Sequence, residues 1–90
     1  MGDLVENLPP FHLAFPVDDL ELARKWYVEN LGCEVGRESE KSCVLNLFGH
    51  QIVAHKVEEM PLVEENGVDN KMVPCNHFGC ILEWEHWHKL

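Results

Sequence analysis

The sequence predicts an α+β fold that consists of one complete βαβββ module and the first strand and helix start of a second. Three observations predict it: an amphipathic helix with a capping residue at each end, strand-length apolar runs on both sides of that helix, and a C-terminal stretch that is similar to the first strand. The chain has 90 residues. This length suits one small domain and excludes two, because stable single cores usually need roughly 100–150 residues.

The first strand is predicted at residues 11–15. Before it, residues 1–10 form an arm that ends in two prolines, which lack the N–H donors of a helix or a central strand. From Phe11 to Phe15, every second side chain is large and apolar, as expected when one face of a strand is buried. Pro16 is expected to end this strand.

A helix is predicted from residue 19 to residue 31. Asp18 supplies an N-cap oxygen, and Glu21 stands three residues later, as in a capping box. Gly32 supplies the left-handed residue that ends many helices. One face of the helix is apolar and is expected to pack on a sheet. It carries Leu20, Ala23, Trp26, Tyr27 and Leu31.

Three further strands are predicted at residues 33–38, 42–48 and 50–57. The tight turn signalled by Phe48 and Gly49 joins the last two, so the three strands form an antiparallel meander. They complete the first module, which spans residues 11–57.

The rest of the chain is predicted to be a loop and the start of a second module. Residues 58–75 are acidic and show no sustained period, which indicates a loop. Residues 76–84 have the pattern of a strand, and residues 85–90 begin a helix. The stretch that starts at His77 is similar to the one that starts 65 residues earlier at His12. Residues 76–90 are therefore expected to open a second copy of the module within one domain, residues 11–90.

Charge and composition exclude several classes of function. The chain carries 16 acidic and 7 basic residues, for a formal net charge of −9, and this sign disfavours nucleic acids and anionic membrane surfaces as partners. It contains no apolar run of membrane-spanning length and no N-terminal export signal. We therefore expect a cytoplasmic protein whose four cysteines are thiols.

Several short motifs stand together between residues 10 and 90. They are FHLAFPV at 11–17, DL at 19–20, AR at 23–24, WY at 26–27, LGC at 31–33, FGHQ at 48–51, VP at 73–74 and HFG at 77–79. In this combination they resemble the vicinal oxygen chelate (VOC) superfamily, and in particular its small glyoxalase/bleomycin-resistance/dioxygenase-like proteins.

The resemblance implies two βαβββ modules whose sheets curve into one cup, with a divalent metal ion at its floor. Position by position, it makes His12 on the first strand and His77 on the fifth strand metal ligands. The ligand position on the fourth strand falls at Val53, which cannot bind a metal ion. This excludes the ligand set of glyoxalase-like members and favours that of extradiol-type dioxygenases, in which two histidines are joined by a glutamate from the eighth strand.

Such a ligand set implies Fe(II), with Mn(II) or Zn(II) as alternatives. It leaves positions on the metal for dioxygen and a small oxygenated or aromatic substrate. The glutamate would lie beyond Leu90. Three explanations follow: the chain is a fragment, a partner chain supplies the third ligand, or the site has been lost.

His55 is the candidate catalytic residue. It shares a strand face with Val53, which places it in the cup as a hydrogen-bond donor to the ligands or as a proton carrier. The alternative is a strand-end residue in water. Gln51 shares the same face and is expected to line the cavity, whereas His50 faces the other way as a turn residue.

A rival zinc site near the C-terminus is the second metal hypothesis. Its donors would be Cys75, His77, Cys80, His86 and His88. A strand over residues 76–84 would turn Cys80 away from the other cysteine, so this site requires that strand to be absent.

The favoured function is a metal-dependent VOC protein that acts on a small molecule as a non-haem Fe(II) ring-cleavage dioxygenase does. The alternatives are a non-catalytic protein that sequesters a small molecule and an inactive truncated fragment. Trp84, Trp87 and Leu90 have no cover within the chain, which favours a homodimer.

Overall fold

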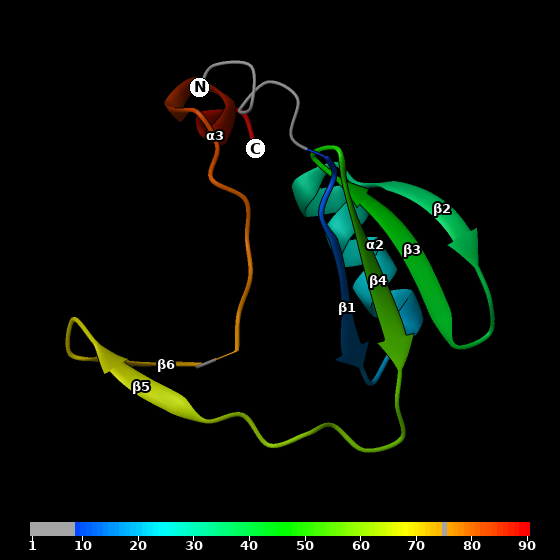
Figure 1. Ribbon diagram of the computed structural model, residues 1–90, viewed down its shortest axis with the longest axis horizontal. Helices are drawn as coiled ribbons and strands as arrows, with labels where there is room; N and C mark the ends of the chain where they lie inside the picture. Colours follow the sequence, from blue (N-terminus) through cyan, green and yellow to red (C-terminus); the bar gives the residue numbers. More distant parts are fainter. Residues whose placement is uncertain (1–8, 75) are drawn as a thin grey trace.

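The structure is a computed structural model, and it describes residues 9–74 and 76–90. Residues 1–8, which make up most of the predicted arm, and Cys75 of the rival zinc site lie outside the described residues. The described chain contains a four-stranded sheet. Figure 1 shows a long helix behind this sheet and a C-terminal arm that leaves the sheet and returns toward its upper end.

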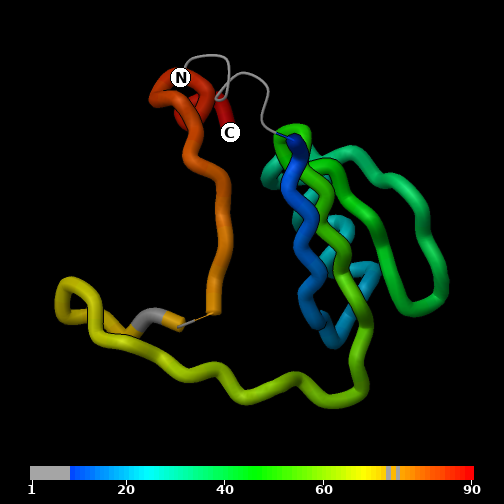
Figure 2. The backbone as a smooth tube through the Cα atoms, in the orientation of Figure 1, coloured from blue at the N-terminus to red at the C-terminus, as the bar shows by residue number. Residues whose placement is uncertain are grey.

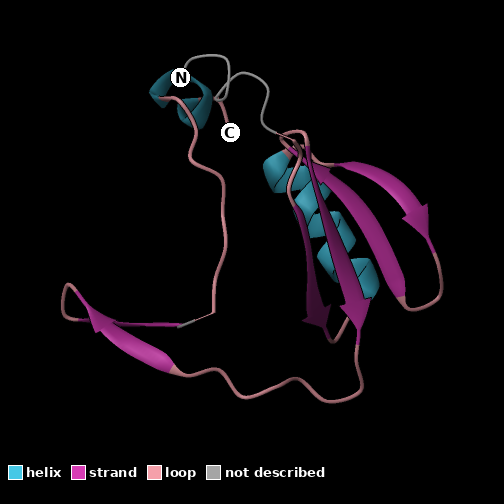
Figure 3. Cartoon of the chain, in the orientation of Figure 1, coloured by secondary structure: helices cyan, strands magenta, loops and turns pink. Residues whose placement is uncertain are grey.

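The predicted βαβββ module is present (Figure 3). It contains β1 (His12–Val17), α2 (Leu20–Leu31), β2 (Glu34–Glu38), β3 (Ser42–Leu47) and β4 (His50–Lys56). The strand order is β1-β4-β3-β2, with β1 parallel to β4 and the other three strands in the expected antiparallel meander. Helix α2 covers one face of this sheet and leaves the other face open.

The core of the module lies between α2 and the sheet. Leu45 and Ala54 are fully buried, and Ile52 is 2% exposed. Phe15 from β1 and Tyr27 from α2 pack against this cluster, with their ring centroids 5.6 Å apart. Full burial of one such side chain stabilises the fold by about 1.5–3 kcal/mol, so this interface is the main source of stability.

Both ends of α2 carry caps, but the N-cap is not the residue expected. The carboxylate of Asp19, rather than that of Asp18, accepts a hydrogen bond from the backbone N–H of Leu22 at 2.9 Å. An N-cap bonds the N–H two or three residues ahead, and Asp19 has the extended backbone that this position requires. Gly32 ends the helix at φ 68°, as predicted.

Pro16 does not end the first strand, which is a correction to the sequence prediction. It lies within β1, level with His55 of β4. The carbonyls of Phe11 and Val17 point toward β4, where they accept hydrogen bonds from Gln51 and Val57. The backbone groups of successive residues in a strand point in opposite directions. The backbone of Pro16, next to Val17, therefore faces away from β4, and its missing N–H removes no hydrogen bond of the sheet.

The stretch predicted as a loop, residues 58–75, contains a β-hairpin. Strands β5 (Glu65–Val68) and β6 (Lys71–Pro74) pair only with each other. Asp69 and Asn70 connect them, with φ 50° and 65°. Aspartate and asparagine adopt positive φ more readily than most residues, and two such residues in a row favour a two-residue hairpin turn.

The strand predicted over residues 76–84 is not formed. Residues 76–83 run without strand hydrogen bonding, and helix α3 (Trp84–His88) begins at the last residue of the predicted strand. This segment packs through Phe78, whose ring centroid is 5.2 Å from that of Phe15. A strand needs a partner for its backbone groups, and in the described part of the chain this segment has only side-chain packing.

The C-terminal arm makes the molecule open in shape (Figure 2). The radius of gyration of the Cα atoms is 15.1 Å, whereas a compact domain of this length has about 12 Å. Neither helix of the described chain has the length and apolar character needed to cross a lipid bilayer.

Candidate functional site

The open face of the sheet carries most of the predicted site residues. Side chains of paired residues on neighbouring strands point to the same side. His12 is level with Gln51, which is level with Asn46 of β3. Phe15, which alternates with the His12 side, packs with α2. His12 and Gln51 therefore lie on the face that α2 leaves open.

His12 and Gln51 form the central contact of this face. The His12 Nδ1 and the Gln51 Oε1 are 2.6 Å apart. An amide oxygen only accepts hydrogen bonds, so Nδ1 carries the ring proton and Nε2 keeps its lone pair. This is the tautomer that binds a metal ion through Nε2 while an oxygen orients the ring.

The register also corrects the position assigned to the fourth strand. Val53 is level with Ala14, which lies two residues further along β1 than His12. The side chain that faces His12 from β4 is Gln51. Val53 therefore no longer excludes the ligand set of glyoxalase-like members. The sequence shows that Gln51 and Val53 share a face, but the pairing of β1 with β4 decides which of them contacts His12. A sequence motif gives no direct measure of that register.

Val53 instead lies at the centre of an apolar strip. It is flanked by Ala14 on β1 and Val44 on β3, and it is 7% exposed. The open face is therefore polar at the His12 end and apolar in the middle.

His55 lies on the open face, as predicted, but at its opposite end. It is level with Pro16 on β1 and Ser42 on β3. Four residues separate it from Gln51, which corresponds to about 13 Å along a strand. His55 is exposed. His55 is thus too far from the His12 ring to bind the same metal ion.

His77 is held by a local contact in the C-terminal arm. Its Nδ1 is 2.9 Å from the carbonyl oxygen of Pro74. The carbonyl accepts, so this ring also carries its proton on Nδ1 and leaves Nε2 for another partner. His12 and His77 thus present the same tautomer from different parts of the chain.

No group of three or more His, Cys, Asp or Glu side chains within the described ranges 9–74 and 76–90 is arranged to hold a metal ion. His12 and His77 are not brought into such a group, and neither are Cys80, His86 and His88 of the rival zinc site. The strand that would have separated the zinc donors is absent, yet those of them that the structure describes do not converge.

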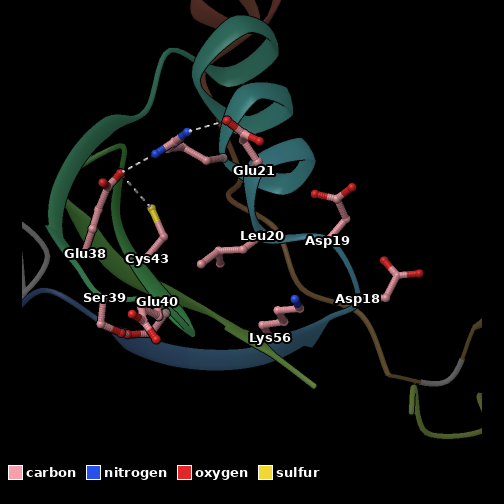
Figure 4. Close-up of a pocket in the computed structure, with 11 residues that line it drawn as sticks. Asp18, Asp19, Leu20, Glu21, Glu38, Ser39, Glu40, Cys43 and Lys56 are labelled. Atoms are coloured by element: carbon pink, nitrogen blue, oxygen red, sulfur yellow. Dashed lines mark hydrogen bonds and ion pairs between the residues drawn. The ribbon is translucent and has the colours of Figure 1, made fainter. Parts of the chain in front are cut away.

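A separate pocket of about 460 Å³ lies at the N-terminal end of α2 (Figure 4). Three of its charged groups, Glu21, Arg24 and Glu38, pair with one another. Arg24 donates to Glu38 at 2.9 Å and lies 3.7 Å from Glu21. The hydrogen bond to Glu38, followed by the charge of that carboxylate, raises the pKa of Arg24. Exposed ion pairs of this kind contribute little stability.

The thiol in this pocket belongs to Cys43, which is 1% exposed. Its Sγ is 3.8 Å from Glu38 Oε1, and the two are joined in Figure 4. Burial, followed by the nearby Glu38 charge, raises the pKa of the Cys43 thiol. Because the thiolate is the reactive form, Cys43 is not a nucleophile at neutral pH.

Comparison with known proteins gives a structural likeness. No protein-family model matches the chain, and no curated protein matches it. Among solved structures it is similar to a glyoxalase/bleomycin resistance protein/dioxygenase from Alicyclobacillus acidocaldarius, with 29% sequence identity and a TM-score of 0.67. The match covers 91% of this chain and 58% of that protein. The chain therefore has the α+β fold of the glyoxalase/bleomycin resistance/dioxygenase proteins over part of their length, and this confirms the resemblance to the VOC superfamily that its motifs indicate.

Proposed function

We propose that the chain is part of a metal-dependent VOC protein that acts on a small oxygenated or aromatic molecule, as extradiol-type dioxygenases do. One observation carries the proposal: His12 and His77 each donate Nδ1–H to an oxygen and keep Nε2 as a lone-pair donor. Histidines that bind metal ions usually show this arrangement.

The types of donor suit a divalent metal ion, although the described residues do not bring three such donors together. Imidazole nitrogens suit Fe(II) and Zn(II), and Mn(II) accepts them together with oxygen ligands. A bound Fe(II) would supply a centre that holds an oxygenated substrate next to dioxygen. In this proposal His12 and His77 are ligands, and a carboxylate from further chain or from a second protomer of a homodimer completes the set. Gln51 is assigned the role of orienting the His12 ring, and not that of a ligand, because its Oε1 accepts from His12 Nδ1. The extradiol-type set is therefore kept.

The apolar strip of the open face is proposed to hold the substrate. Ala14, Val44 and Val53 form a flat patch next to the Gln51 end of the sheet. A substrate that lies along it would reach toward His55, which is proposed to hold or accept a substrate proton.

Metal affinity tests the ligand assignment without any need for turnover. Mn(II) binding, followed by its electron paramagnetic resonance signal, is expected to weaken about 10–100-fold in Gln51→Leu, the usual effect of removing the partner of a ligand. Larger losses are expected in His12→Ala and in His77→Ala. His55→Ala is the matched control on the same face and is expected to bind Mn(II) as the unaltered chain does. Equal affinities in all four variants would remove the proposed site.

The apolar strip also supports a second candidate, a protein that sequesters a small aromatic molecule without converting it. Oxygen uptake with catechol and Fe(II) separates the two functions. Uptake that His55→Ala reduces supports the enzyme. Saturable catechol binding with no uptake supports sequestration.

A further inference from the structure

A second cavity lies on the other face of the sheet, away from His12 and Gln51. It encloses about 380 Å³ and is bounded by β1, β4 and the turn between β3 and β4 on one side, and by residues 78–82 of the arm on the other. Leu13 and Ile52, which alternate with the residues of the open face, form its floor. This cavity is separate from the proposed metal site, and nothing in the proposed function uses it.

The walls of the cavity are apolar, with one ionisable ring. Phe11, Phe78 and Cys80 contribute apolar or weakly polar surface, and His50 is the exception. A volume of this size falls at the lower end of the range of small-molecule sites, about 300–1,000 Å³, which are mostly apolar with a few polar groups that fix orientation.

A backbone contact determines which nitrogen of the neutral His50 ring carries the proton. The N–H of Phe11 donates to the His50 Nδ1 at 2.8 Å. A nitrogen that accepts a hydrogen bond carries no proton, so the proton of the neutral ring is on Nε2. Among the hydrogen bonds of the described residues, none uses this Nε2–H. The neutral ring, which contributes to the lining of the cavity, therefore carries a free donor and no free acceptor.

From this combination we propose that the cavity binds a small aromatic carboxylate, with its ring among Leu13, Ile52 and Phe78 and its oxygen accepting from His50 Nε2. A cation is disfavoured because the ring offers it no lone pair. A sugar or nucleotide is disfavoured because the apolar walls would leave most of its hydroxyl groups without partners.

Binding at this cavity would join the two parts of the molecule. One wall belongs to the module and the other to the arm, where Phe78 is in contact with Phe15. A ligand that contacts both walls is expected to hold residues 78–82 against the sheet, since anything that binds only the closed arrangement favours it.

The probe for this proposal is 4-fluorobenzoate, with 4-fluorotoluene as its uncharged counterpart, observed by fluorine NMR. In the unaltered chain, 4-fluorobenzoate is expected to bind saturably and to shift the amide signals of Leu13, Ile52 and Gly79. In His50→Phe, which keeps an aromatic ring and removes the donor, 4-fluorobenzoate is expected to bind about tenfold more weakly, the usual effect of losing a hydrogen bond to a charged group. The affinity for 4-fluorotoluene is expected to stay within about twofold.

Two further variants keep the test decisive. Cys80→Phe fills the cavity from the exposed arm and is expected to abolish binding of both probes. Leu62→Phe, at a solvated position of the arm outside the cavity, is expected to change neither. Circular dichroism checks that each variant is folded. The proposal is overturned if Cys80→Phe binds both probes normally or if the shifted amides lie on the open face. It is also overturned if the unaltered chain binds neither probe because a second copy of the chain occupies the cavity, which sedimentation would show as a dimer.

Discussion

The βαβββ module and the C-terminal arm differ in whether their apolar side chains are buried. In the module, residues 9–57, apolar side chains such as Leu45 and Ile52 are buried between a helix and a sheet. In the arm, residues 58–90, Leu62 is 99% exposed and Ile81 is fully exposed. Secondary structure forms in both parts, but only the module closes a core. A hairpin or a short helix that packs on no second layer of structure therefore forms no core. The face of a sheet or helix must be covered by another element to contribute much stability.

In the described residues, the arm contacts the module through Cys80, which packs against the core cluster, and through two aromatic pairs. Phe78 meets Phe15 with ring centroids 5.2 Å apart, and His86 meets Phe48 at the same distance. Trp84 stacks on Trp87 within α3 itself, and Trp84 is 73% exposed. Regions with few buried contacts open more easily than the core does, so the arm is the part expected to exchange its amide hydrogens first.

The largest expected effect comes from truncating one leucine in each part. Leu45→Ala is expected to lower the free energy of unfolding by about 2–5 kcal/mol, through lost burial and the cavity left behind. Leu62→Ala, at a fully solvated position of the arm, is expected to stay within about 0.5 kcal/mol of the unaltered chain. Urea unfolding followed by circular dichroism measures both. Similar losses in the two variants would show that the arm has a core of its own.

A smaller effect is expected at the start of α2, where two adjacent aspartates differ in their contacts. Asp19→Ala removes the acceptor for the Leu22 N–H and is expected to cost about 0.5–2 kcal/mol. Asp18→Ala removes no cap and is expected to change the free energy of unfolding by less than about 0.5 kcal/mol. The same urea experiment compares them. If Asp18→Ala were the more costly change, the cap would be one residue earlier, as first expected from the sequence.

The smallest expected effect is a dependence of stability on alkaline pH that originates in the module. Burial raises the pKa values of the Cys33 and Cys43 thiols, with smaller contributions from Cys80 and Glu38 respectively. When folding raises the pKa of a group, its contribution to the stability of the fold is complete at pH values below the pKa in the unfolded chain, which is about 8.5 for cysteine. That contribution is lost as the pH rises through the higher pKa of the folded state.

Unfolding midpoints measured from pH 7 to pH 10 check this sign. The midpoint is expected to fall above about pH 8.5, and to fall less steeply in the double variant Cys33→Ala, Cys43→Ala. Burial also raises the pKa of Tyr27, which adds to the decline at still higher pH and remains in the double variant. A midpoint that rose with pH would contradict the burial of these thiols.

The sequence predicts the elements that depend on local signals. The apolar face of α2, its C-cap at Gly32 and the turn at Phe48 and Gly49 are predicted from neighbouring residues. The C-cap and the turn are confirmed. The face is confirmed at Leu20, Tyr27 and Leu31, which pack against the core, but not at Trp26, which is 51% exposed. The N-cap prediction was wrong by one residue, because two adjacent aspartates offer the same oxygen and only backbone geometry separates them.

Features that depend on distant partners were harder to predict. The contact of His12 with Gln51 depends on a register between strands 39 residues apart in the chain. The alternating pattern of residues 76–84 predicted a strand, but a strand requires a partner for its backbone. In contrast, Asp69 and Asn70 are residue types that favour a hairpin turn, but the acidic, aperiodic sequence around them is typical of a loop.

The proline in β1 has a consequence for how the molecule meets other copies of itself. β1 is an edge strand of the sheet, and an edge strand presents free backbone groups on which another chain can extend the sheet. Because Pro16 points outward and carries no N–H, it interrupts that row of donors near one end. Proline on an edge strand is one of the ways in which proteins limit pairing with another chain, and at this position it costs the native sheet none of its own hydrogen bonds.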